Sequence, residues 1–66
     1  MDRAIAISIA VDNDSFGVTY DDRNREIARI LRELADSLED GIDTSNQIPL
    51  KDSNGSTVGF MEETVL

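Results

Sequence analysis

Carboxylates are the side chains in this sequence that are numerous enough to suggest a chemical role. Fourteen Asp and Glu stand against six Lys and Arg in 66 residues, which gives a formal net charge of −8. The sequence has no His and no Cys, which excludes His-based proton relays, thiolate metal sites and disulfides. A strong acidic excess also disfavours nucleic acid and anionic membranes as direct partners. The remaining candidates are a cation site, a carboxylate acid–base pair and an acidic surface for a basic protein.

One segment has part of the spacing of a calcium-binding loop. Asp12, Asp14 and Gly17 stand at positions one, three and six of such a loop. Phe16 stands at position five, however, and Arg23 stands at position twelve, where a bidentate Glu is required. We therefore expect a turn before a helix here, and no metal site.

Adjacent acids such as Asp21 and Asp22, or Glu62 and Glu63, have the composition of an acid–base pair. Exposed neighbouring carboxylates are normally solvated, and acid–base catalysis needs a concave, shielded site. The Ser and Thr residues have no His to activate them. We expect no enzyme activity and no cofactor.

Hydrophobic periodicity predicts the elements that position the acids. Over residues 4–11, large apolar side chains alternate with small ones, which predicts a strand with one large and one small face. A longer helix is predicted over residues 20–40, where apolar residues recur with a period near 3.6. Thr19 followed by Asp22 resembles a capping box, although Asn24 is an alternative cap, and Gly41 is a natural stop.

A hairpin is predicted over residues 48–62, with its turn at residues 52–56. A two-residue loop would put Phe60 on the same face as Lys51. A three-residue loop, with Gly55 left-handed, sets Leu50 opposite Val58 and Ile48 opposite Phe60, and so gathers four apolar side chains on one face. We therefore predict the three-residue loop.

These elements predict a single α+β domain over residues 1–66, with the order β-α-β-β. Pro49 cannot donate to a strand ladder and belongs on an edge strand. The third strand is then central, and the antiparallel sheet has the order 1-3-2 with the helix on one face. The other face would carry small residues, Ala4 to Ala10 at even positions among them. The predicted core is Ile5, Ile7, Ile9, Val11, Ile27, Ile30, Leu31, Leu34, Leu38, Ile48, Leu50, Val58 and Phe60.

This topology gathers unbalanced negative charge at one end of the molecule. The start of the first strand, the end of the helix, the linker of residues 42–47 and the end of the third strand all lie there. Residues 33–66 hold eight acids and one base. The acids either keep a small protein soluble or imitate a row of phosphates before a basic partner. The candidate partner-binding residues are Asp36, Glu39, Asp40, Asp43, Glu62 and Glu63.

Three segments resemble a family of small phage and prophage proteins: residues 26–36, 38–41 and 52–59, preceded by Asp12-Asn13 and Phe16. The resemblance covers most of the chain and implies a β-α-β-β fold. Small acidic phage proteins of this size also resemble anti-CRISPR inhibitors, several of which act as DNA mimics against the nucleic-acid groove of a CRISPR effector complex. That likeness rests on size, charge and origin, and it implies a binding inhibitor without catalytic residues.

We therefore expect a phage-encoded inhibitor of a basic nucleic-acid-binding protein, with a subunit of a type I CRISPR effector complex as the first candidate partner. The alternative is a phage accessory or structural interaction module, homodimeric through the Ala-rich sheet face. The longest apolar stretch, residues 4–11, is too short to span a bilayer, which takes about 20 helical residues. With a chain that starts at Met1, we expect a complete small reading frame whose product lies in the cytosol of the host cell.

Overall fold

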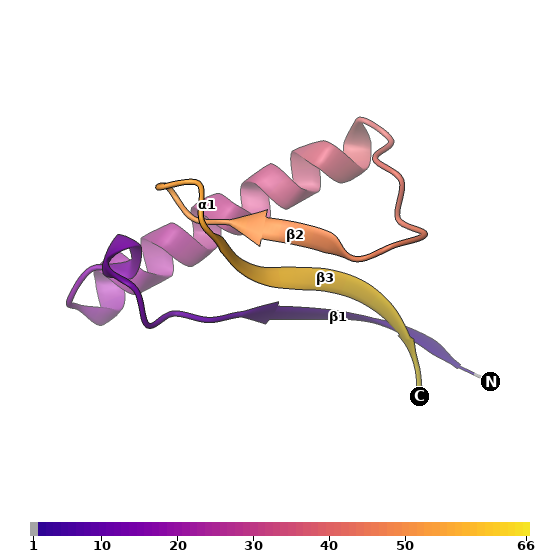
Figure 1. The fold of residues 1–66 in the computed structure, drawn as a ribbon, viewed down its shortest axis with the longest axis horizontal. Helices are drawn as coiled ribbons and strands as arrows, with labels where there is room; N and C mark the ends of the chain where they lie inside the picture. Colours follow the sequence, from indigo (N-terminus) through magenta and orange to yellow (C-terminus); the bar gives the residue numbers. More distant parts are fainter. Residues whose placement is uncertain (1) are drawn as a thin grey trace.

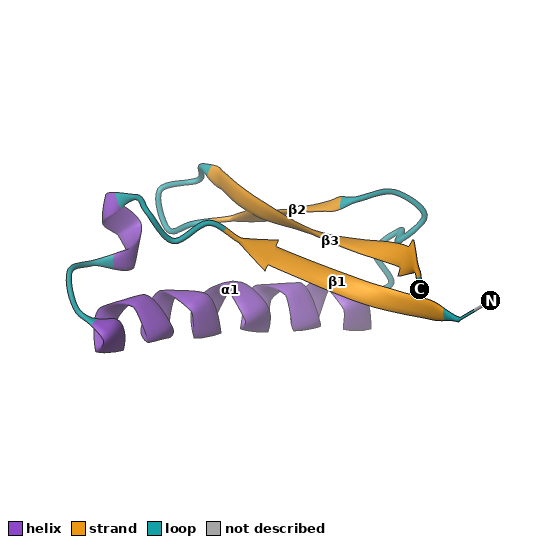
Figure 2. Cartoon of the chain, turned by 90° about the horizontal axis from the view of Figure 1, so that it is seen from below, coloured by secondary structure: helices purple, strands orange, loops and turns teal. Residues whose placement is uncertain are grey.

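The chain folds as a β-α-β-β unit in which one helix covers one face of a three-stranded antiparallel sheet (Figures 1 and 2). The computed structural model describes residues 2–66. The strand order is β1-β3-β2, so the predicted fold class and topology are confirmed. The elements are β1 (Arg3–Ile9), the 3₁₀ turn η1 (Asp14–Phe16), α1 (Tyr20–Glu39), β2 (Ile48–Lys51) and β3 (Thr57–Val65).

Local side-chain chemistry sets both ends of α1. The Thr19 hydroxyl accepts the backbone N–H of Asp22 at 3.1 Å, which satisfies one of the unpaired donors of the first turn. At the other end, Gly41 has a φ of 84°, a left-handed conformation that an L side chain disfavours. The helix thus ends at Glu39, one residue before the predicted end.

The hairpin turn has the predicted three-residue loop. The N–H of Asp52 donates to the carbonyl of Ser56 at 2.9 Å, and Lys51 pairs with Thr57. Gly55 has a φ of 83°, as a left-handed turn position requires.

Beyond this turn the predicted register is wrong, because β3 has one extra residue. After Lys51 and Thr57, the next pair is Leu50 with Gly59, which leaves Val58 as a bulge. A one-residue shift moves every later side chain to the opposite face. A Cβ at position 59 would overlap the backbone carbonyl oxygen of Ser8, so glycine fits this close approach. The remaining pairs are Pro49 with Phe60 and Ile48 with Met61.

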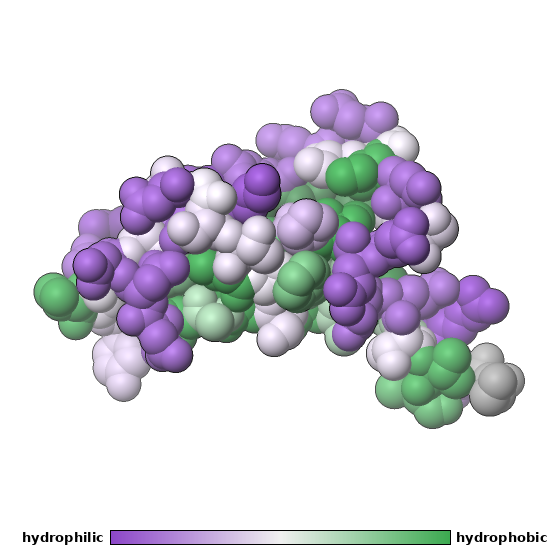
Figure 3. All heavy atoms as spheres, viewed as in Figure 1, coloured by the Kyte–Doolittle hydropathy of each residue, from purple (hydrophilic) through white to green (hydrophobic). Residues whose placement is uncertain are grey.

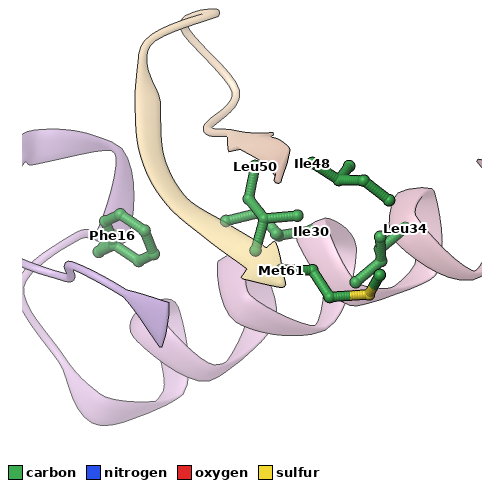
Figure 4. Packing of buried hydrophobic residues seen from close by; sticks show 6 residues of the cluster. All are labelled: Phe16, Ile30, Leu34, Ile48, Leu50 and Met61. Carbon is green, nitrogen blue, oxygen red and sulfur yellow. The ribbon is translucent and has the colours of Figure 1, made fainter. Parts of the chain in front are cut away.

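The bulge exchanges two residues of the predicted core. Met61 is 5% exposed and packs in the core, whereas Phe60 is 42% exposed on the other face of the sheet. Phe16, which the sequence places in a turn, is 1% exposed. The buried apolar residues come from η1, α1, β2 and β3 (Figure 4): Phe16, Ile30, Leu34, Ile48, Leu50 and Met61. Ile9, Val11, Ile27 and Val58 are partly buried against them.

The predicted burial of the first strand is only partly correct. Ile5 and Ile7 are 56% and 46% exposed, and Leu31 and Leu38 on the helix are 39% and 41% exposed. The reason is the direction of α1, which runs obliquely to the strands and passes behind β2 (Figure 1). The C-terminal end of the helix is therefore its farthest part from β1. A single helix laid across the sheet in this way leaves the first half of β1 uncovered.

Candidate functional site

Six predicted carboxylates lie exposed at one end of the molecule, and we call them the acidic end: Asp36, Glu39, Asp40, Asp43, Glu62 and Glu63. The last turn of α1, the linker and the end of β3 all reach this end, at the right of Figure 1. Figure 3 shows hydrophilic residues over the upper part of the same end. The acids form two groups, one on the helix and one on the linker and β3.

The helix group consists of Asp36, Glu39 and Asp40. No basic residue lies in the last turn of α1. These carboxylates therefore face the negative end of the helix dipole, which costs about 0.3–1 kcal/mol for each exposed acid there. Arg32 and Asp36 stand four residues apart on α1, the spacing of a helix ion pair, but no ion pair joins them in residues 2–66. Local stability thus gives no reason for acids at these positions.

Two acids of the second group accept hydrogen bonds from the linker of residues 42–47. Gln47 Nε2 donates to Glu62 Oε2 at 2.6 Å, which links the linker to β3. Asp43 accepts the N–H of Ser45 at 2.9 Å, and this backbone hydrogen bond lowers the pKa of the Asp43 carboxyl. Residues 44–47 and the two β3 glutamates line a shallow hollow between the linker and the strand.

One member of the acidic end has a cationic partner. Arg3 Nη1 lies 2.9 Å from Glu63 Oε2, and both side chains are exposed. In residues 2–66, the other ion pairs involve Arg25 and Arg29 with acids of the first four turns of α1. The other five carboxylates of the acidic end therefore have no ion pair within the described residues.

Two other acids are buried, and neither belongs to the predicted site. The first is Glu26, which is 7% exposed on α1. Its carboxylate accepts Arg29 Nε at 2.7 Å and the N–H of Ser53 at 2.8 Å. The hydrogen bond from Arg29 is the main cause that lowers the pKa of Glu26, and it outweighs the opposite effect of burial.

The second buried acid is Asp52, which is 4% exposed at the start of the hairpin turn. Its Oδ1 accepts the N–H groups of Asn54 and Ser56 at 3.0 and 2.9 Å. Its Oδ2 accepts Asn13 Nδ2 at 2.8 Å and the Ser15 hydroxyl at 2.9 Å. Burial raises the pKa of Asp52, but the four hydrogen bonds together outweigh it and lower the pKa.

Glu26 and Asp52 hold the hairpin turn against the helix and against the turn before α1. Both oxygens of each carboxylate accept hydrogen bonds from within the protein, so these bonds hold both acids ionised at neutral pH. The signal that could have found Asp52 is its turn sequence, since an Asp that begins a turn commonly accepts N–H groups two residues on.

One hollow between η1 and α1 is lined by charged side chains, among them Asp14, Arg25 and Glu26, whose carboxylate is already bonded to Arg29. Two other hollows hold fewer charged groups. One lies between η1 and the first turn of α1, where the Arg23 guanidinium carbon stands 4.5 Å above the Tyr20 ring. Another lies between the end of β1 and the start of β3, and Asp12 and Asn13 contribute to its lining. Within residues 2–66, no three carboxylates stand close enough to hold a metal ion.

Comparisons with protein-family models, with curated proteins and with solved structures found no match to this chain. Within the described residues, no helix combines the length and the apolar character that crossing a bilayer requires. The charge distribution and the exposed surfaces are therefore the features that bear on function.

Proposed function

We propose that this protein is a non-catalytic inhibitor that binds a basic, nucleic-acid-binding protein through its acidic end. The observation that supports this proposal is the set of five carboxylates there with no ion pair within the described residues. The last turn of α1 carries acids where a base would stabilise the helix. Such charges, unfavourable within the fold, gain favourable partners when a cationic surface approaches.

Carboxylates spaced along a rigid element can take the place of backbone phosphates. A groove that binds nucleic acid is lined with Lys and Arg, and the charges of an acidic protein steer it to such a groove. The molecule is elongated, with extents of 40 × 26 × 17 Å, and the acidic end lies at one end of its longest axis (Figure 1). The likeness to small phage proteins makes a type I CRISPR effector complex the first partner to test.

Neutralising the helix group should remove inhibition while leaving the fold intact. The test variant carries Asp36→Asn, Glu39→Gln and Asp40→Asn. We expect the wild-type protein to displace target DNA from a purified type I effector complex in a gel-shift assay, and the variant to need at least about tenfold more protein. Inhibition by the wild type should also weaken as salt is raised, because exposed charges are screened.

The control removes the same charge from the other end of the molecule with Asp12→Asn, Asp14→Asn and Asp21→Asn. It should inhibit within about threefold of the wild type, since three charges distant from the contact change the encounter only weakly. If both variants lose inhibition equally, the net charge alone is responsible. If both retain inhibition equally, the result contradicts mimicry by the helix group. An inactive wild-type protein would exclude this effector complex as the partner.

A further inference from the structure

β1 exposes large apolar side chains on the face that α1 should cover. Ile7 pairs with Met61, so both side chains stand on the helix-facing side of the sheet. Met61 is 5% exposed, but Ile7 is 46% and Ile5 is 56% exposed. On α1, Arg29 and Glu26 bond to Lys51 and Ser53. The helical period puts Leu31 and Leu38 on the opposite flank, away from β2, where they are 39% and 41% exposed. This half of the core lacks a covering layer.

The outer edge of β1 is also unpaired. The N–H of Ala10 donates to Val58 at 2.8 Å, and the N–H of Leu66 donates to Asp2 at 3.0 Å. In an antiparallel pair such bonds fall on alternate residues, so the even-numbered positions of β1 bond to β3. The N–H and C=O groups of Arg3, Ile5, Ile7 and Ile9 therefore point away from the sheet.

The two edges of this sheet differ in their protection. β2 has four residues, Pro49 lies in it, and the carbonyl of Lys51 accepts Arg29 Nη2 at 3.0 Å. β1 has seven residues, no proline, and no charge from Ala4 to Val11. Short strands, prolines and charges are the usual protection against edge pairing, and β1 lacks them over most of its length.

We propose that β1 pairs antiparallel with β1 of a second copy of this chain, so that two three-stranded sheets join into one of six strands. A two-fold axis at Ala6 sets Ile5 of one copy opposite Ile7 of the other. The pairs then join residues whose N–H and C=O groups both point outward. The four isoleucines meet on the helix-facing side, in the space that neither helix fills.

A second copy fits this edge because the strand is complementary to itself. On the outer face of the sheet, the same axis puts Ala4 opposite Ser8 of the other copy and Ala6 opposite Ala6, with no like charges opposed. The antiparallel arrangement also sets the uncovered half of one β1 beside the covered half of the other. A foreign strand would need this same pattern of small and branched residues.

Two copies that each carry a charge of −8 repel each other, but salt screens the repulsion between the glutamates nearest the joined strands. The two β3 strands, which carry Glu62 and Glu63, would be separated by both β1 strands, about 14 Å across the sheet. That separation exceeds the screening length of about 8 Å at physiological salt. Because Glu62 pairs with Ala6, Glu62 of each copy lies level with the two-fold axis, one strand away from the joined edge. The Ala-rich face, where the sequence analysis placed a dimer contact, would remain free.

The test is the mass of the full chain in solution, measured by sedimentation over a hundredfold range of concentration. The wild type should pass from 7.3 kDa toward twice that mass as concentration rises. Ile7→Lys should raise the dissociation constant at least about tenfold, because it sets charges of like sign within the joined strands. Phe60→Lys and Val18→Lys, which alter exposed apolar residues away from this edge, should leave association unchanged.

Amide hydrogen exchange distinguishes strand pairing from other contacts. The N–H groups of Ile5 and Ile7 should be protected at high concentration and exchange quickly on dilution or in Ile7→Lys, whose circular dichroism should match the wild type. A wild type that stays monomeric throughout would overturn the proposal. Association lost in Phe60→Lys but kept in Ile7→Lys would place the contact on the Ala-rich face and overturn it, as would a dimer whose two amides exchange quickly.

Discussion

Phe16→Ala should lower the free energy of unfolding by about 3–5 kcal/mol, the usual cost of truncating a buried Phe. The side chain is 1% exposed, and within residues 2–66 the core has only five other buried apolar residues. A domain of this size draws about 3–5 kcal/mol of net stability from a single core. We therefore expect the variant to be largely unfolded at room temperature in the absence of a stabilising partner or cosolvent.

Urea unfolding followed by circular dichroism measures this effect. Val18→Ala is the matched control, since Val18 lies two residues away and is 98% exposed. It should shift the unfolding free energy by less than about 0.5 kcal/mol. If both variants unfold at the same urea concentration as the wild type, η1 does not close the core as the structure indicates.

The fold could be predicted because its decisive signals are local. The helix period over residues 20–40, the Thr19 cap and the Gly41 stop are each read from adjacent residues, and all three are confirmed. Pro49 on an edge then left β3 in the middle of the sheet, which is the observed order. These predictions need no knowledge of how the helix lies on the sheet.

The errors came from packing between distant segments. The bulge at Val58 stands beside the close approach of Gly59 to Ser8, a contact between strands that the hairpin sequence does not reveal. Burial of Phe16 depends on η1 folding back over the end of the core. Exposure of Ile5 depends on the oblique direction of α1, which sequence periodicity does not determine.

The sequence predicts where the candidate site lies, but it does not predict which of the acids there have partners. Topology alone brings the helix end, the linker and the end of β3 to one end of the molecule (Figure 1). The ion pair of Arg3 with Glu63 and the hydrogen bond from Gln47 to Glu62 depend on side-chain geometry. The acidic end therefore has its least compensated charge on the helix group, which is why the proposed test neutralises that group.

Asp52→Asn should destabilise the protein strongly at neutral pH, although the two side chains have nearly the same shape. The amide oxygen can still accept the N–H groups of Asn54 and Ser56, but an NH₂ group then faces the donor Nδ2 of Asn13. A buried donor left without an acceptor is costly. We expect the folding equilibrium constant to fall by about tenfold or more, measured by urea unfolding at pH 7.

Asp12→Asn is the matched control, because Asp12 is exposed and loses the same charge. Relief of repulsion in a chain of charge −8 should make this control neutral or slightly stabilising. A control that destabilises as much as Asp52→Asn would mean that charge, and not the hydrogen bonds of the turn, causes the loss.

A comparison of the wild type with Asp52→Asn at different pH values tests whether the buried carboxylate of Asp52 is the cause of the difference in stability. The pKa of Asp52 is lower in the folded protein than its unfolded value of about 3.9, so its contribution is complete above that pH and is lost as the pH falls through the folded pKa. The stability gap between the wild type and Asp52→Asn should therefore be largest at neutral pH and shrink toward pH 2. The pKa of Glu26 is lowered as well, chiefly by Arg29, so Glu26→Gln should show a gap of the same sign. A gap that stays constant with pH would show that these carboxylates are not held ionised by their hydrogen bonds.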